Sequence, residues 1–124
     1  MLAVPIRIGH SADPDDAFMA WAFEAGQVDA RGLEFELVAS DIQTLNEWAL
    51  DGRLEVTALS AGTYPAVADR YLLLPHGASF GEGYGPIVVA REELDPREVE
   101  IVTPGPLTTA TRVLKLALGD DVRT

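Results

Sequence analysis

The stretch that decides the fold is residues 6–16, IRIGHSADPDD. Its first five residues have the apolar, β-branched composition of a strand. The rest is typical of a helix start, with Asp13 as the capping residue, Pro14 at the first helical position and two more acids in the first turn. The helix should continue to about Phe23 and end near Gly26. A strand followed directly by a helix is the repeating unit of α/β sheets.

The same unit recurs along the chain. Alternation predicts a strand over residues 33–38, and Asp41 should cap a helix that ends near Gly52. The predicted elements that follow are a strand at 56–60, a short helix at 64–70, strands at 71–74, 86–90 and 99–102, and a helix from Thr108 to about Leu118. This order implies an α/β fold, with a parallel or mixed sheet and helices on both of its faces.

The charged segment 91–97 is expected to cross between two lobes. Residues 1–92 then form a first α/β lobe, and residues 93–124 form the crossing and the first strand–helix unit of a second, incomplete lobe. One such unit cannot bury its own apolar faces. We therefore expect a partner chain, as in a homodimer, or further residues of a longer protein to complete the second lobe.

Composition narrows the range of functions. The chain has 124 residues, 48% of them hydrophobic, with a formal net charge of −11 and no cysteine. Such acidity argues against binding to nucleic acid or to an anionic membrane surface, because no basic stripe is present to neutralise phosphates. The lack of cysteine excludes disulfides and thiolate catalysis. With neither a signal-peptide pattern nor a run of ~20 apolar residues, a cytoplasmic location is expected.

Three strand-to-helix junctions share the same chemistry, namely residues 9–14, 58–63 and 103–110. Each is rich in serine, threonine or glycine, and each opens a predicted helix. In open α/β sheets ligands bind at the carboxyl ends of the strands, where free N–H groups and the helix dipole favour an anion. The sequence therefore predicts a site for a small-molecule carboxylate, divided between two lobes. No metal and no organic cofactor is implied.

Other motifs have a plainer interpretation beside the functional one. The clustered Asp13, Asp15 and Asp16 could bind a divalent cation, but the proline among them favours helix capping. His10 ends the first strand, where a catalytic base could lie, although a lone histidine there is more often structural. His76 is expected to be exposed. The glycines of residues 81–85 lie between two predicted strands, which indicates a mobile or hinge-side turn rather than a nucleotide loop.

Several blocks are distinctive together: SADPDDAF at 11–18, DIQTLNEWAL at 41–50, TALSA at 57–61, GYGPIVVAR at 83–91, and PG followed by TTA within 104–110. They resemble the 1,4-dihydroxy-6-naphthoate synthase family of the futalosine route to menaquinone, collinearly along essentially the whole chain. The resemblance implies a periplasmic-binding-protein-like (type II) two-lobe fold, of which this chain supplies the first lobe and the start of the second. It also implies a lyase that converts cyclic de-hypoxanthine futalosine to 1,4-dihydroxy-6-naphthoate, beginning with proton abstraction.

By matching motifs, the resemblance assigns substrate binding to six residues: Asn46, Ala58, Leu59, Ser60, Thr109 and Ala110. The junctions add His10, Ser11 and Thr108 as further candidates. The family's general-base histidine lies beyond the position of Thr124, so no catalytic residue is assigned, and this chain alone is expected to be inactive. Two alternatives stay open, chorismate dehydratase of the same pathway and a non-catalytic protein that binds small carboxylates. The Thr-Leu-Asn block favours the synthase.

Overall fold

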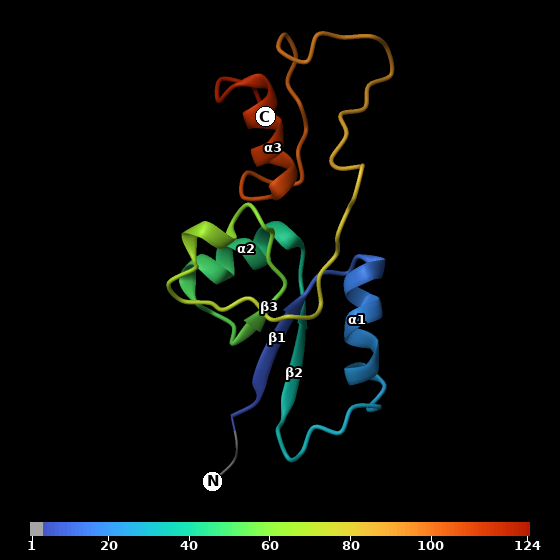
Figure 1. Cartoon of the computed structure of the whole chain (residues 1–124), viewed down its shortest axis with the longest axis vertical. Helices are drawn as coiled ribbons and strands as arrows, with labels where there is room; N and C mark the ends of the chain where they lie inside the picture. Colours follow the sequence, from blue (N-terminus) through green and yellow to red (C-terminus); the bar gives the residue numbers. More distant parts are fainter. Residues whose placement is uncertain (1–3) are drawn as a thin grey trace.

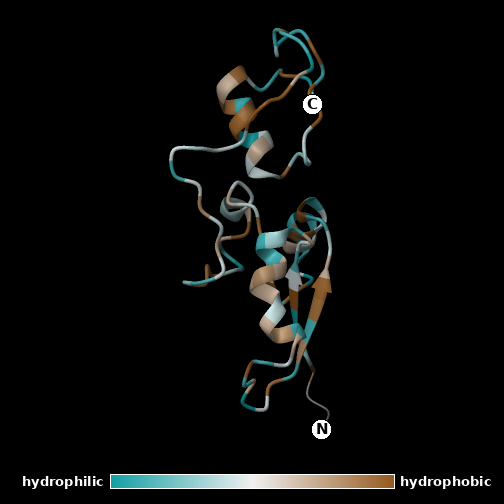
Figure 2. Ribbon diagram, turned by 90° about the vertical axis from the view of Figure 1, so that its right-hand side faces the viewer, coloured by the Kyte–Doolittle hydropathy of each residue, from teal (hydrophilic) through white to brown (hydrophobic). Residues whose placement is uncertain are grey.

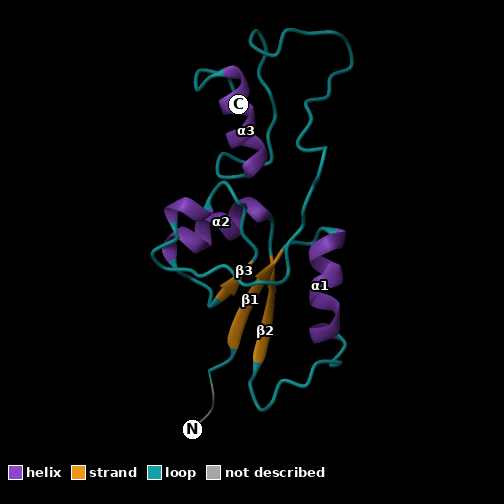
Figure 3. Ribbon diagram, in the orientation of Figure 1, coloured by secondary structure: helices purple, strands orange, loops and turns teal. Residues whose placement is uncertain are grey.

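A computed structural model describes residues 4–124, and Figures 1 and 3 show its arrangement. The elements in chain order are β1 (Ile6–His10), α1 (Pro14–Glu24), β2 (Phe35–Ala39), α2 (Ile42–Asp51), β3 (Val56–Thr57), a single 3-10 turn η1 (Tyr64–Ala66) and α3 (Thr109–Leu118). The predicted βαβαβ order of the first 57 residues is thus confirmed, as is the α/β class.

The three strands form a parallel sheet in the order β2-β1-β3. Ile8 of β1 lies opposite Leu37 on one side and Val56 on the other. On one face, Phe23 of α1 meets Phe35 edge-on, with ring centroids 5.3 Å apart. The other face carries α2. The sheet therefore has a helix on each face, as right-handed crossovers between parallel strands require when the chain moves first to one side of β1 and then to the other.

Gly9 allows α2 to pack closely on β1. A Cβ atom at this position would lie 2.8 Å from Cδ2 of Leu45 in α2 and 2.6 Å from Cδ1 of Leu54. Leu45 is fully buried and Leu54 nearly so. The apolar core is small and lies mainly on this side of the sheet, and it consists of Leu45, Ala49, Leu54 and Val67, with Ala20 on α1 and Val122 near the C-terminal end.

The side chains at the starts of α2 and α3 make capping bonds, the first of which was predicted. The carboxylate of Asp41 accepts the N–H of Thr44 at 3.0 Å, and the Thr108 hydroxyl accepts the N–H of Thr111 at 3.4 Å. Gly52 ends α2 with a positive φ of 67°, the left-handed conformation that glycine adopts at least cost. Asp13 occupies the capping position of α1, but its side chain makes no capping bond, so that part of the prediction is wrong.

The strands predicted at 71–74, 86–90 and 99–102 are wrong, because between Ala66 and Thr109 the described chain contains no helix or strand. The third strand covers two residues instead of 56–60, and the helix predicted at 64–70 is reduced to one 3-10 turn. Apolar, β-branched composition favours a strand only where a neighbouring strand supplies the hydrogen bonds. Every residue from 72 to 95 is instead exposed. In Figures 1 and 2 this segment is a long loop leading to α3.

Candidate functional site

The candidate site lies where residues 58–63, the loop that follows β3 (the β3 loop), meet the start of α3. In Figure 1, α3 stands beyond the carboxyl ends of the strands and faces the loop that follows β3. Most of the residues predicted from the sequence come from these two segments. The structure therefore brings together, at the carboxyl edge of the sheet, groups that are about 50 residues apart in the chain.

Asn46 anchors the β3 loop through two hydrogen bonds to Ser60. Its Nδ2 donates to Oγ of Ser60 at 3.0 Å, and its Oδ1 accepts the N–H of Ser60 at 2.9 Å. Asn46 is completely buried, on the side of α2 that faces the sheet, while Ser60 is half-buried. A buried amide that satisfies both of its ends in this way sets the orientation of the serine, whose hydroxyl still has a hydrogen to donate.

Ala58 and Leu59 lead into this pair from the sheet. The N–H of Ala58 donates to the carbonyl of Gly9 at 2.8 Å, which extends the parallel ladder one step past β3. The carbonyl of Ala58 accepts the hydroxyl of Thr57 at 2.9 Å. Both predicted residues are half-buried. They are thus held at the carboxyl edge by backbone bonds, and Ser60 follows directly.

Thr109 connects the start of α3 to the same loop. Its Oγ1 accepts the N–H of Gly62 at 3.0 Å. Gly62 leaves little space here, since a Cβ atom on it would lie 3.2 Å from Cα of Thr109. Thr109 and Ala110 are the first two residues of α3, and the first N–H groups of an α-helix have no acceptor within the helix. These N–H groups and the Ser60 hydroxyl are suited to hold a carboxylate.

Thr108 stabilises the turn that leads into α3. It is only 4% exposed, and its hydroxyl donates to the carbonyl of Gly105 at 2.8 Å while it caps α3. Thr111, fully buried, donates to the same carbonyl at 2.7 Å. Of the two neighbouring threonines, Thr109 is therefore the one whose hydroxyl reaches the β3 loop.

His10 and Ser11 form the end of β1. Nδ1 of His10 lies 2.9 Å from the carbonyl oxygen of Ser11, so its ring bonds to its own neighbour. Ser11 is 4% exposed, its N–H donates to Asp16 at 2.8 Å, and its Oγ accepts the N–H of Asp13 at 3.3 Å. Asp16 thus reaches back over the start of α1. These bonds tie the residues that precede α1 to its first turn, whereas the Asp13 side chain makes no capping bond.

Two of the three aspartates at the start of α1 accept hydrogen bonds from serine residues. A hydrogen bond from Ser79 lowers the pKa of Asp15, and Asp16 accepts from Ser11 as described. In the part of the chain that the structure describes, no three His, Cys, Asp or Glu side chains are grouped so that they could hold a metal ion. His76 is exposed, as predicted.

Sequence reasoning did not single out Gln43, Thr63 or Leu107. Oε1 of Gln43 accepts the N–H of Leu107 at 3.0 Å, and the hydroxyl of Thr63 donates to the carbonyl of Leu107 at 2.6 Å. The segment before α3 is thus bonded to both α2 and the β3 loop. Nothing local in the sequence signals these contacts, since the paired residues are 64 and 44 positions apart.

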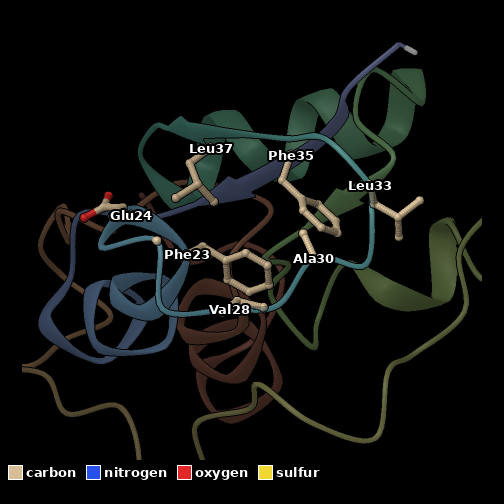
Figure 4. Close-up of a pocket in the computed structure, with 8 residues that line it drawn as sticks. Phe23, Glu24, Val28, Ala30, Leu33, Phe35 and Leu37 are labelled. Carbon is tan, nitrogen blue, oxygen red and sulfur yellow. The ribbon is translucent and has the colours of Figure 1, made fainter.

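A hollow of about 420 Å³ lies elsewhere on the molecule, between α1 and β2. Figure 4 shows Phe23, Val28 and Phe35 around it, with the carboxylate of Glu24 pointing away. Glu24 is the one lining residue with a polar side chain, and the hollow lies near the start of β2, at the end of the sheet opposite the candidate site. It brings no group with acid–base or nucleophilic chemistry to the loops described above.

Comparison with known proteins gives the family. The sequence profile of the menaquinone biosynthesis family matches residues 6–124. The chain belongs to this family. Two relatives are both named 1,4-dihydroxy-6-naphthoate synthase. They confirm the family resemblance that the sequence motifs indicated. The chain is 43% identical to the Thermus thermophilus enzyme over 112 residues, 90% of this chain and 41% of that protein. It is 32% identical to the Streptomyces coelicolor enzyme over 123 residues, 98% of this chain and 43% of that protein.

Part of a crystal structure of an Archaeoglobus fulgidus protein has the same fold as this chain. The TM-score is 0.89 and the identity 47%, over 97% of this chain and 45% of that protein. The chain therefore spans less than half the length of the relatives it matches. Among residues 4–124, no helix has the length and apolar content needed to cross a membrane.

Proposed function

We propose that this chain takes part in the 1,4-dihydroxy-6-naphthoate synthase step of menaquinone biosynthesis and holds a carboxylate of the substrate at its carboxyl-edge site. The observation that carries the proposal is the 43% identity over 112 residues to the Thermus thermophilus synthase. The match includes most of the chain and so involves both the β3 loop and the start of α3. The lyase chemistry and the two-lobe periplasmic-binding-protein-like fold expected from the resemblance belong to this proposal, as does the cytoplasmic location expected from the sequence.

The geometry supports carboxylate binding. The Ser60 hydroxyl is oriented by a buried amide, and the Thr109 hydroxyl joins the same loop through Gly62. The unbonded N–H groups at the start of α3 add donors and the positive end of the helix dipole. No described residue here is assigned as the base. We therefore expect the 124-residue chain to bind the ligand without turning it over.

The test uses 1,4-dihydroxy-6-naphthoate itself as the ligand in isothermal titration calorimetry. We expect saturable binding at one site, weakened about tenfold in both Ser60→Ala and Thr109→Val, as loss of a hydrogen bond to an anion predicts. Thr124→Val is the matched control for Thr109→Val and should bind like the wild type. Circular dichroism of each variant checks that the fold is kept.

Three outcomes would change the proposal. Wild-type chain that is folded and does not bind the naphthoate would overturn it. Binding of chorismate in place of the naphthoate would favour the dehydratase alternative. Saturable binding that neither Ser60→Ala nor Thr109→Val weakens would move the site away from the carboxyl edge.

A further inference from the structure

We infer that Gln43 and Thr63 are positioning residues that hold Leu107, and with it the start of α3, at a fixed place over the β3 loop. This inference rests on the proposed function, because it concerns how the β3 loop and the start of α3, the two parts of that site, are held relative to each other. The side chains of Gln43 and Thr63 make no bond to the hydroxyls or N–H groups that would meet the carboxylate, although the backbone N–H of Thr63 donates to the Ser60 carbonyl at 2.8 Å. Their role is to place Thr109 relative to Ser60.

Leu107 is bonded on both sides of its peptide chain. Its N–H donates to Oε1 of Gln43, in the first turn of α2, and its carbonyl accepts from the hydroxyl of Thr63, in the β3 loop. Thr63 is completely buried. The two bonds come from different elements of the first 63 residues, so they fix both the position and the direction of the backbone that enters α3.

Gly105 packs directly against the side chain of Gln43. A Cβ atom at this position would overlap the Gln43 side chain, lying 2.6 Å from its Cγ, and φ is 136°, where residues with a side chain are strained. The Gly105 carbonyl accepts from the hydroxyls of Thr108 and Thr111. Hydrogen bonds to the Gly105 carbonyl therefore stabilise the turn formed by residues 105–108. Gln43 and Thr63 bond this turn, at Leu107, to α2 and to the β3 loop.

The other end of the Gln43 amide provides a control. Its Nε2 donates to Oε1 of Glu47, one turn along α2, at 2.9 Å. This exposed bond orients the amide but does not reach Leu107. A positioning role requires only the acceptor at Oε1, so replacement of Glu47 should matter little, whereas loss of the acceptor should matter much.

The first readout is hydrogen exchange of the Leu107 amide by NMR, which needs no ligand. Gln43→Met removes the acceptor in a side chain of similar length, and we expect Leu107 exchange to become at least tenfold faster. Glu47→Gln alone should leave protection unchanged. Gln43→Glu combined with Glu47→Gln keeps an acceptor oxygen without placing two carboxylates in contact, and it should restore protection. Thr63→Val should loosen the segment, and Thr63→Ser, which keeps the hydroxyl, should rescue it.

The second readout is affinity for 1,4-dihydroxy-6-naphthoate. We expect it to fall about tenfold in Gln43→Met and Thr63→Val and to return in Thr63→Ser and in the double variant of Gln43→Glu with Glu47→Gln. Leu107 protection that survives Gln43→Met would overturn the inference whatever the ligand does. Faster exchange with unchanged affinity would also overturn it, since the contact would then not position the site. A wild-type chain that does not bind the naphthoate, with Leu107 still protected through Gln43, would refute the proposed function and leave a structural contact only.

Discussion

The side-chain amide of Asn46 makes two hydrogen bonds to one residue, Ser60, donating to the hydroxyl at 3.0 Å and accepting the backbone N–H at 2.9 Å. Asn46 is buried in α2, and Ser60 lies in the β3 loop 14 residues later. Helix and loop are therefore joined by a polar contact inside the small apolar core. A contact of this kind fixes a loop conformation that apolar packing alone would leave adjustable.

Asn46→Ala should lower the free energy of unfolding by about 2–3 kcal/mol, because it leaves the N–H of Ser60 unbonded and creates a cavity. Ser60→Ala keeps the backbone N–H of Ser60 satisfied but removes the acceptor of the buried Asn46 Nδ2, so a loss of about 1–2 kcal/mol is expected. Urea unfolding of both single variants and the double variant measures the coupling, which should be about 1 kcal/mol or more. Strictly additive effects would show that the two residues do not act as a pair.

Gly9→Ala should destabilise the protein by about 1–3 kcal/mol, because the added methyl group would overlap Leu45 and Leu54 and push α2 away from β1. Gly85→Ala is the matched control, since a Cβ atom there meets nothing within 4 Å. Its effect should stay within about 0.5 kcal/mol. Urea unfolding of the two variants makes the comparison. Equal stability for both would contradict the close approach of α2 to Gly9.

The features that the sequence predicted correctly are local. The start of α2 depends on Asp41 and Thr44, three residues apart, and its end depends on Gly52, so the pattern contained all that was needed. The parallel βαβαβ order of the first 57 residues followed from the same local signals together with the handedness of crossovers.

The features that were missed depend on distant partners. Residues 71–74 and 86–90 have a strand's composition, but a strand forms only against another strand, and pairing cannot be deduced from composition. The contact of Gln43 with Leu107 spans 64 residues, and glutamine has no pattern that marks such a bond. For the candidate site, the motifs singled out Ser60 and Thr109, whereas the bonds of Gln43 and Thr63 to Leu107 became visible only in three dimensions.

The two aspartates that precede α1 and α2 should differ in their contribution. Asp41→Ala removes a carboxylate that accepts both the N–H and the hydroxyl of Thr44, so we expect Tm to fall by about 4 °C. Asp13→Ala removes a side chain that makes no capping bond, and Tm should change by about 1 °C or less. Differential scanning calorimetry measures both. A larger loss in Asp13→Ala than in Asp41→Ala would contradict the observed caps.

The pair of Arg7 and Glu55 should make stability depend on pH in the acidic range. Two side-chain hydrogen bonds from the guanidinium, at 2.8 and 3.0 Å, and one from the backbone N–H of Arg7 lower the pKa of Glu55 to about 2, from 4.5 for an unperturbed glutamate. Because the folded state holds the carboxylate ionised, the stabilisation is complete above pH 4.5. It is lost as the pH falls through the folded-state pKa.

Glu55→Gln tests this dependence. At pH 7 the variant should melt about 2 °C below the wild type, a small difference because both partners are nearly half exposed. The difference should shrink between pH 4.5 and pH 2 and vanish below that, and high salt should reduce it at pH 7. Glu93→Gln removes the same charge from the exposed segment and should show no such trend. A difference between Glu55→Gln and wild type that stayed constant from pH 7 to pH 2 would mean that ionised Glu55 does not stabilise the fold through Arg7.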